Sequence, residues 1–291
     1  MATLSTETLT RIFNLLRQNM SKQPFYPNEE TQKRCLEALR RNTKLLAHGW
    51  HNERNGPIQI VLLLLFLALS AAPSQAQQRK NFPTSTYKRE SINGFSILIN
   101  PEVFKHKEEA KELLKEVDSQ LKAIVRVVPA KPLSALKKVP IWLEYKMNVN
   151  GANGATYHPS AQWLKENGYN PDKARSVEVT NAPNFVKWSQ TGQPWMLLHE
   201  LAHGYHDIVF GFNNKAIEVA YKQAVKRKLY DSVEYINGGK KKAYAMTNPR
   251  EYFAELSEAY FGKNDFFPFT RAELKTHDPV GYQLMQKAWG K

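Results

Sequence analysis

The sequence predicts an α+β protein with a small, strand-containing N-terminal lobe, a helical C-terminal lobe and an active-site cleft between them. Short strand candidates and one long helix occupy the region before Thr191, whereas only helical patterns follow it. The two halves therefore differ in the kind of structure that their sequences favour. With 291 residues, of which 42% are hydrophobic, the chain is long enough to bury a substantial core.

The elements of the N-terminal lobe follow from periodicity and from turn residues. Residues 92–104 (INGFSILINPEVF) predict a short strand and a turn. Residues 105–128 predict a helix because their apolar side chains recur at helical spacing. We expect a loop in 129–138 (PAKPLSALKK) and a strongly apolar strand in 139–147 (VPIWLEYKM).

The rest of the chain completes both lobes. The Gly- and Asn-rich stretch 148–160 predicts a turn that leads into a short extended segment, and 176–183 (SVEVTNAP) predicts another strand. We expect GATYHPS (154–160) to be an edge strand that an extended ligand can pair with. The helical segments of the C-terminal lobe are 194–211, 214–230, 248–262 and 278–289.

An unbroken apolar run lies within residues 58–76 (IQIVLLLLFLALSAAPSQA) and predicts a signal peptide. The run Ile60–Ala72 is shorter than the roughly 20 residues that span a bilayer. It is followed by small residues that fit a signal-peptidase site ahead of Gln77. We therefore expect the chain beyond Gln77 to be secreted or otherwise extracytoplasmic, in a periplasm or at a cell surface.

Residues 1–57 form an extension that is much longer than the ordinary n-region of a signal peptide. In one interpretation the true start of translation lies further downstream, and no stable membrane insertion remains after signal cleavage. In another, the extension is a cytoplasmic tail and the apolar run is a membrane anchor. A buried core helix is a third alternative. The polar residues 77–91 predict a linker, and 92–291 predict the folded domain.

Charge and cysteine content exclude several classes of protein. The net charge of +14 comes with no arginine-rich tract or nucleic-acid signature, so we expect solvated basic faces and no nucleic-acid partner. Weak attraction to acidic polymers or surfaces is the functional alternative. Cys35 is the single cysteine, which excludes an internal disulfide and a Cys-x-x-Cys site.

The segment MLLHELAHGYHD (196–207) carries the residues that favour metal chemistry. His199 and His203 lie one turn apart on a helix, at about 40° to one another, so both imidazoles can reach one zinc ion. Glu200 is rotated away from the pair by one residue. It lies too far round the helix to coordinate easily but close to a metal-bound water, and is the natural general base. An ordinary helix with surface histidines is the alternative.

His206 and Asp207 follow the motif but do not complete it. On a continuous helix His206 lies about 10 Å along the axis from His199, too far for both to bind one ion. We therefore expect His206 to line the cleft, to support the site from behind, or to be an ordinary partly buried histidine. Asp207 either supports a ligand or pairs with a lysine.

A catalytic zinc ion needs a third protein ligand, and Glu251 in NPREYFAE (248–255) is the best candidate. Asn248 and Pro249 are typical of a helix start, so a capping box is the alternative role for Glu251. Glu255 lies one turn on, on the same face, and two carboxylates so placed repel unless positive charge lies opposite. We expect Glu255 to orient a ligand histidine.

The two segments together resemble the anthrax lethal factor-type zinc metallopeptidases. The resemblance rests on HELAH (199–203) and on Tyr244-x-x-Thr-Asn-x-x-Glu251-Tyr-Phe-Ala-Glu255. It implies a zincin-like fold, one Zn²⁺ per chain held by His199, His203 and Glu251, Glu200 as base, and Tyr244 as a hydrogen-bond donor in the transition state. From spacing alone, Tyr244 is equally well a packed tyrosine.

The sequence thus predicts a secreted zinc metalloendopeptidase of the gluzincin type, with an extended peptide or protein as substrate. Glu200 serves as general base, and Tyr244, assisted by His206, stabilises the oxyanion. A zinc amidohydrolase that acts on cell-wall peptides shares every ligand and is the first alternative. A non-catalytic extracellular binding module on a zincin fold is the second, although such a module has no need of Glu200.

Overall fold

The computed structural model describes residues 81–147 and 154–290. All of them belong to one compact unit, Arg79–Lys291. Among these residues, no helix is both long enough and apolar enough to span a bilayer. The upstream extension (1–57) and the signal peptide (58–76) that we predicted lie outside the described residues.

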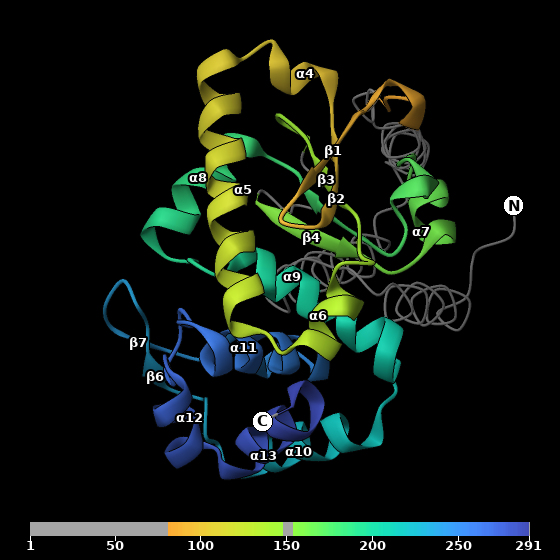
Figure 1. Cartoon of the computed structure of the whole chain (residues 1–291). Helices are drawn as coiled ribbons and strands as arrows, with labels where there is room; N and C mark the ends of the chain where they lie inside the picture. The colour runs from red at the N-terminus through yellow and green to blue at the C-terminus, as the bar shows by residue number, and fades with distance from the viewer. Residues whose placement is uncertain (1–80, 148–153, 291) are drawn as a thin grey trace, which may run out of the picture. The chain divides into compact units, whose positions relative to one another are not determined.

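The unit is an α+β structure built on a five-stranded mixed sheet (Figure 1). The strand order is β1-β2-β3-β5-β4. β2 and β3 are parallel, as are β3 and β5, whereas β1 and β4 run antiparallel to their neighbours. The strands are β1 (Lys88–Ile92), β2 (Phe95–Ile99), β3 (Ile141–Leu143), β4 (Ala155–His158) and β5 (Ser176–Val179).

The first two strands form a tight hairpin. Asn93 and Gly94 connect them with φ angles of 52° and 83°, the left-handed pair that a two-residue type I′ turn requires. The strand β1 begins at Lys88, so the prediction that residues 77–91 are a linker is wrong for their last part. The strand was missed because its residues, KRESI, alternate weakly and are largely exposed.

One long helix and several short ones accompany the sheet. α5 (Lys107–Val127) confirms the helix predicted at 105–128, and it packs Leu113, Val117 and Leu121 into the core. α6 (Ala130–Leu136) replaces the loop predicted at 129–138. Pro132 is compatible with it because a proline in the first turn of a helix loses no hydrogen bond. The remaining short elements are η2 (Thr84–Thr86), α4 (Pro101–Phe104), α7 (Ala161–Glu166), η3 (Pro171–Lys173) and α8 (Ala182–Thr191).

The C-terminal half is helical, as predicted. All four predicted segments form helices, and a short helix, α12, was missed between the last two. A small hairpin and a 3-10 turn precede α11. The elements are α9 (Met196–Tyr205), a π-helical turn η4 (His206–Phe210), α10 (Lys215–Lys226), β6 (Val233–Glu234), β7 (Lys240–Lys241), η5 (Tyr244–Met246), α11 (Pro249–Phe261), α12 (Arg271–His277) and α13 (Pro279–Trp289).

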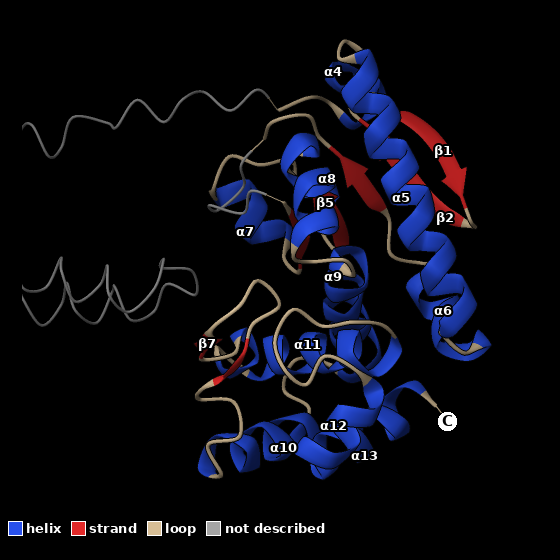
Figure 2. Ribbon diagram, turned by 90° about the vertical axis from the view of Figure 1, so that its left-hand side faces the viewer, coloured by secondary structure: helices blue, strands red, loops and turns tan. Residues whose placement is uncertain are grey.

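Within this unit, α9 lies between the sheet-containing part and the group of helices α10 to α13 (Figure 2). One face of the sheet supplies the main core, which continues through α9 into the C-terminal helices. The three central strands contribute fully buried aliphatic and aromatic side chains to this face, and Tyr157 of β4 joins the same core. The residues from the central strands are Phe95, Ile97, Ile99, Ile141, Leu143, Val177 and Val179.

The opposite face of the sheet carries a buried polar network. Lys173 forms ion pairs with Glu144, at 2.6 Å, and with Glu178. His158 Nε2 lies 2.6 Å from Glu178 Oε2. Buried charges are retained only when they are paired and hydrogen-bonded. Because His158 ends β4 and Glu178 belongs to β5, the network ties the edge strand to the centre of the sheet.

Candidate metal centre

The helix α9 comes close to the edge strand β4 because Gly204 faces it. A Cβ atom at Gly204 would lie 3.1 Å from Tyr157 Cε2 and 3.1 Å from Val139 Cγ2, which is tighter than ordinary packing. Glycine therefore permits this approach of helix to strand. Asp207, just beyond the helix, accepts a hydrogen bond of 2.9 Å from the Tyr157 hydroxyl. Asp207 thus contacts β4, and this is neither the lysine pair nor the ligand support that we expected.

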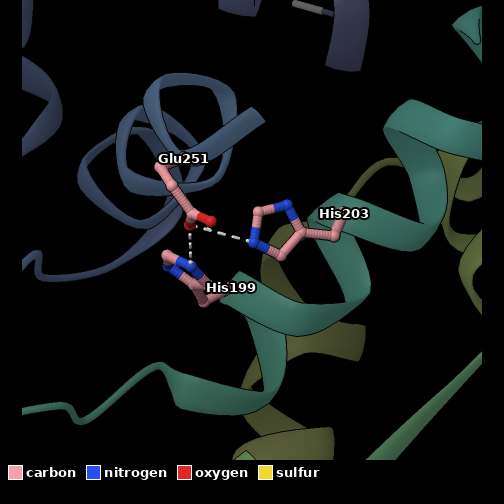
Figure 3. Close-up of side chains that lie close together, drawn as sticks. All are labelled: His199, His203 and Glu251. Carbon is pink, nitrogen blue, oxygen red and sulfur yellow. Dashed lines mark hydrogen bonds and ion pairs between the residues drawn. The ribbon is translucent and has the colours of Figure 1, made fainter. Parts of the chain in front are cut away.

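The three predicted ligands meet at one point (Figure 3). Oε2 of Glu251 lies 3.1 Å from Nε2 of His199 and 3.1 Å from Nε2 of His203. The ligand atoms of the three residues all lie within 4.8 Å of one another. Their side chains keep 12%, 11% and 16% of their surface exposed, so the cluster is reached from solvent at one side. The two imidazole planes are nearly perpendicular, at 81°.

Glu251 reaches this position through a well-capped helix start. Oδ1 of Asn248 accepts hydrogen bonds from the backbone N–H groups of Arg250 and Glu251, at 2.8 and 3.1 Å. Pro249 occupies the first turn. The Glu251 carboxylate itself contacts the two histidines. Capping by Asn248 and a ligand role for Glu251 are therefore compatible, and the cap sets where the carboxylate is presented.

The electrostatics of the cluster match its geometry. Burial acts to lower the pKa of His199, but hydrogen bonds to Glu251 and Glu258 outweigh it and raise that pKa well above its ordinary value. Burial acts to raise the pKa of Glu251. The charge of His203 and the hydrogen bonds to both histidines outweigh burial and hold that pKa well below its ordinary value. Glu251 is thus held as a carboxylate. Protons and a metal ion compete for such a site.

The far side of His199 contacts Glu258, a residue that the sequence analysis did not single out. Nδ1 of His199 lies 2.7 Å from Oε1 of Glu258 but 3.7 Å from Oε1 of Glu255. Glu255 thus lies within ion-pair distance of a ligand histidine, but the hydrogen bond that orients the ring goes to Glu258. Glu258 is seven residues after Glu251 and returns to the same helix face two turns on, so spacing makes it a candidate alongside Glu255 but does not choose between them.

Three acidic side chains are buried together behind His199. Burial raises the pKa of Glu258, and burial together with Asp265 raises that of Glu255 well above its ordinary value. Burial and the Glu258 carboxylate raise the pKa of Asp265 to about 7. Oε2 of Glu255 and Oδ1 of Asp265 have no hydrogen-bond partner within the described part of the chain. This side of the metal cluster is therefore strongly anionic whenever its carboxyl groups ionise.

Glu200 and Tyr244 both interact electrostatically with His199. Glu200 is partly buried, follows His199 on α9, and its charge interacts with those of His199 and Tyr244. Tyr244 precedes α11, keeps 48% of its surface exposed and places its ring 6.2 Å from that of His199. Partial burial and the Glu251 carboxylate raise the pKa of Tyr244 above its ordinary value. Its phenol therefore keeps its proton at neutral pH and is available as a donor.

His206 takes no part in the cluster. Its side chain is fully buried, and its ring lies 5.1 Å from that of Phe212 and 5.0 Å from that of Phe253. Neither ring nitrogen has a hydrogen-bond partner among the residues described. The expectation that His206 lines the cleft or assists Tyr244 is therefore wrong. The backbone keeps α-helical angles at His206, where the π-helical turn begins, so this side of the helix packs into the aromatic core.

This histidine predicts a specific sensitivity to acid. Burial, with help from His203 and Arg250, lowers the pKa of His206 from 6.5 to about 4. The unfolded chain therefore takes up a proton between these values that the folded chain does not, and stability is lost as the pH falls through this window. Between pH 7 and pH 4.5, the free energy of unfolding of metal-free wild type should therefore fall by roughly 2 kcal/mol more than that of metal-free His206→Phe.

Urea unfolding of both proteins in the presence of a chelator measures this difference. His106→Phe is the matched control, because His106 stacks on Tyr145 at a ring distance of 3.5 Å and is partly exposed. This control should follow the wild type. Equal acid losses in wild type and His206→Phe would show that His206 does not cause the sensitivity.

Comparisons of the chain with models of protein families, with curated proteins and with solved structures found no match in any of the three.

Proposed function

We propose that the chain is a zinc-dependent metalloendopeptidase with a zincin-like fold that acts outside the cytoplasm. The observation that carries this proposal is the convergence of His199, His203 and Glu251 on one point, with the ring of Tyr244 6.2 Å from that of His199. Glu200 is close enough to affect the pKa of His199. The site of action rests on the apolar segment 58–76 and its resemblance to a signal peptide.

The donor set fits zinc. Imidazole nitrogens alone suit several first-row divalent ions. Two histidines with one carboxylate, partly exposed on one side, match the three-ligand sets that catalytic zinc sites use with one position left open. Those of the carboxyl groups behind His199 that are ionised add to the attraction for a divalent cation.

A zinc ion held by His199, His203 and Glu251 would supply Lewis-acid polarisation of the scissile carbonyl and a water of lowered pKa. Glu200 takes the proton from the attacking water and later delivers it to the leaving amine. Tyr244 donates its phenolic proton in a hydrogen bond to the developing oxyanion, which the raised pKa of that phenol permits. Glu251 and the two histidines hold the reaction centre fixed with respect to both groups.

An extended peptide is the substrate that the fold favours. β4 pairs with β5 on one side, and its other edge pairs with no strand among the described residues, so we propose that an extended peptide adds there. It contacts α9, which carries His199 and His203. A peptide that adds to such an edge gains main-chain hydrogen bonds without side-chain selection. This edge favours an endopeptidase over a hydrolase of cell-wall amides, although both would use the same ligands.

Metal analysis combined with a peptide-library digest tests the proposal. The full-length protein is expected to contain about one zinc per chain, as in three-ligand catalytic sites. We expect it to cleave internal peptide bonds, and to lose that activity with a chelator and recover it with zinc. Mass spectrometry of the library reports the cleavage positions. A protein that holds one zinc but cleaves no peptide would overturn the peptidase assignment.

A further inference from the structure

We propose that Glu258, rather than Glu255, is the residue that positions His199 for metal binding, an inference that rests on the proposed function. His199 presents its two ring nitrogens to carboxylates on opposite sides. Nε2 faces Glu251 at 3.1 Å, and Nδ1 faces Glu258 at 2.7 Å. Both carboxylates come from α11, so a single helix determines how the ring is held.

The chemistry of imidazole gives this contact its consequence. A neutral histidine that coordinates through Nε2 carries its proton on Nδ1, and a carboxylate that accepts this proton in a hydrogen bond fixes both the tautomer and the ring orientation. Glu258 is close enough to accept it, at 2.7 Å, and its side chain is only 5% exposed. Water therefore offers little competition for the bond.

Glu255 does not meet the same requirement, although it is equally buried. Its nearer oxygen lies 3.7 Å from Nδ1, beyond hydrogen-bond distance. Its other oxygen has no partner within the described residues, and its strongest carboxylate neighbour is Asp265. Neutralising Glu255 therefore leaves the Glu258–His199 bond in place and removes repulsion from around it. This makes Glu255 a matched control, since it shares the helix, the burial and the side-chain type of Glu258.

The same atoms also permit a competing arrangement. Nδ1 of His199 and the carboxylates of Glu255 and Glu258 all lie within 4.8 Å of one another, so they form a second group able to surround an ion. If both groups were filled, His199 would have to bridge two ions and lose both of its ring protons. One ion, with Nδ1–H bonded to Glu258, needs no such deprotonation. Metal stoichiometry separates the two arrangements.

The test compares zinc binding by the full-length wild type, Glu258→Gln and Glu255→Gln, in competition with a chromophoric chelator. We expect Glu258→Gln to weaken zinc binding about 10- to 100-fold, the usual cost of losing such a partner. Glu255→Gln should bind close to wild type. Nitrogen-15 NMR of the imidazoles in the zinc-loaded proteins should show a slowly exchanging His199 Nδ1–H in the wild type and in Glu255→Gln, and faster exchange in Glu258→Gln.

Glu258→Asp provides a second variant if Glu258→Gln folds poorly, because it keeps the charge but moves it away from Nδ1. Its zinc affinity should lie between those of the wild type and Glu258→Gln. The inference is overturned if Glu258→Gln binds zinc as the wild type does, or if the wild type binds two ions per chain. A wild type that binds no zinc would instead overturn the proposed function, and this inference with it.

Discussion

Replacing Glu251 with alanine is expected to remove stoichiometric zinc binding and, with it, all peptide cleavage. Its carboxylate oxygen is the point to which both histidine Nε2 atoms converge, at 3.1 Å each. Removing it leaves two protein ligands, one fewer than catalytic zinc sites use. We therefore expect affinity to fall by several orders of magnitude, measured as zinc retained after dialysis against a weak chelator.

Asn248→Ala separates this ligand role from helix capping. Asn248 supplies the hydrogen bonds that cap α11, and its loss should cost about 0.5–2 kcal/mol of stability while zinc remains bound. His206→Ala should likewise keep zinc, because its ring lies in the aromatic core. If Glu251→Ala kept its zinc and His206→Ala lost it, the third ligand would have been wrongly identified.

The sequence was sufficient to predict the three groups that meet at the centre. Helical spacing places His199 and His203 on one face, and this rule depends on local geometry alone. Glu251 was chosen because a catalytic zinc ion needs a third ligand and because Glu255, on the same face, calls for positive charge opposite. The capping residues Asn248 and Pro249 by themselves favoured a structural role. The sequence also predicted an edge strand at residues 154–160, which follow a turn-forming stretch. The structure confirms it as β4, at the end of the described sheet.

The contacts that sequence reasoning missed depend on how helices pack. Glu255 and Glu258 both lie on the face of α11 that carries Glu251, and the choice between them depends on where α9 crosses it. Lining the cleft was one of the roles expected for His206. The backbone is still α-helical at His206, and what decides its role is the packing of Phe212 and Phe253 against its ring. Residue spacing alone predicts neither the crossing nor this packing.

Glu200→Gln is expected to retain one zinc and to lose nearly all cleavage. Glutamine has the shape of glutamate, and Glu200 is not among the ligand atoms that converge on Glu251, so the metal centre should form normally. The amide cannot take a proton from water or deliver one to the leaving amine. General acid–base groups contribute about 10²–10⁴-fold to rate, and the loss in kcat should reach at least this range.

Tyr244→Phe is the variant that distinguishes loss of the general base from loss of the hydrogen-bond donor to the oxyanion. Tyr244 contributes a donor and no proton acceptor, so Tyr244→Phe should lower kcat while the acidic limb of the pH profile, which reports the base, keeps its position. In Glu200→Gln, the residual cleavage should no longer show the fall in rate at acidic pH that protonation of the base causes. If Glu200→Gln cleaved peptides at the wild-type rate, the base would lie elsewhere. The buried carboxylates behind His199 could not replace it, because Glu258 is 5% exposed and faces Nδ1, away from the open side.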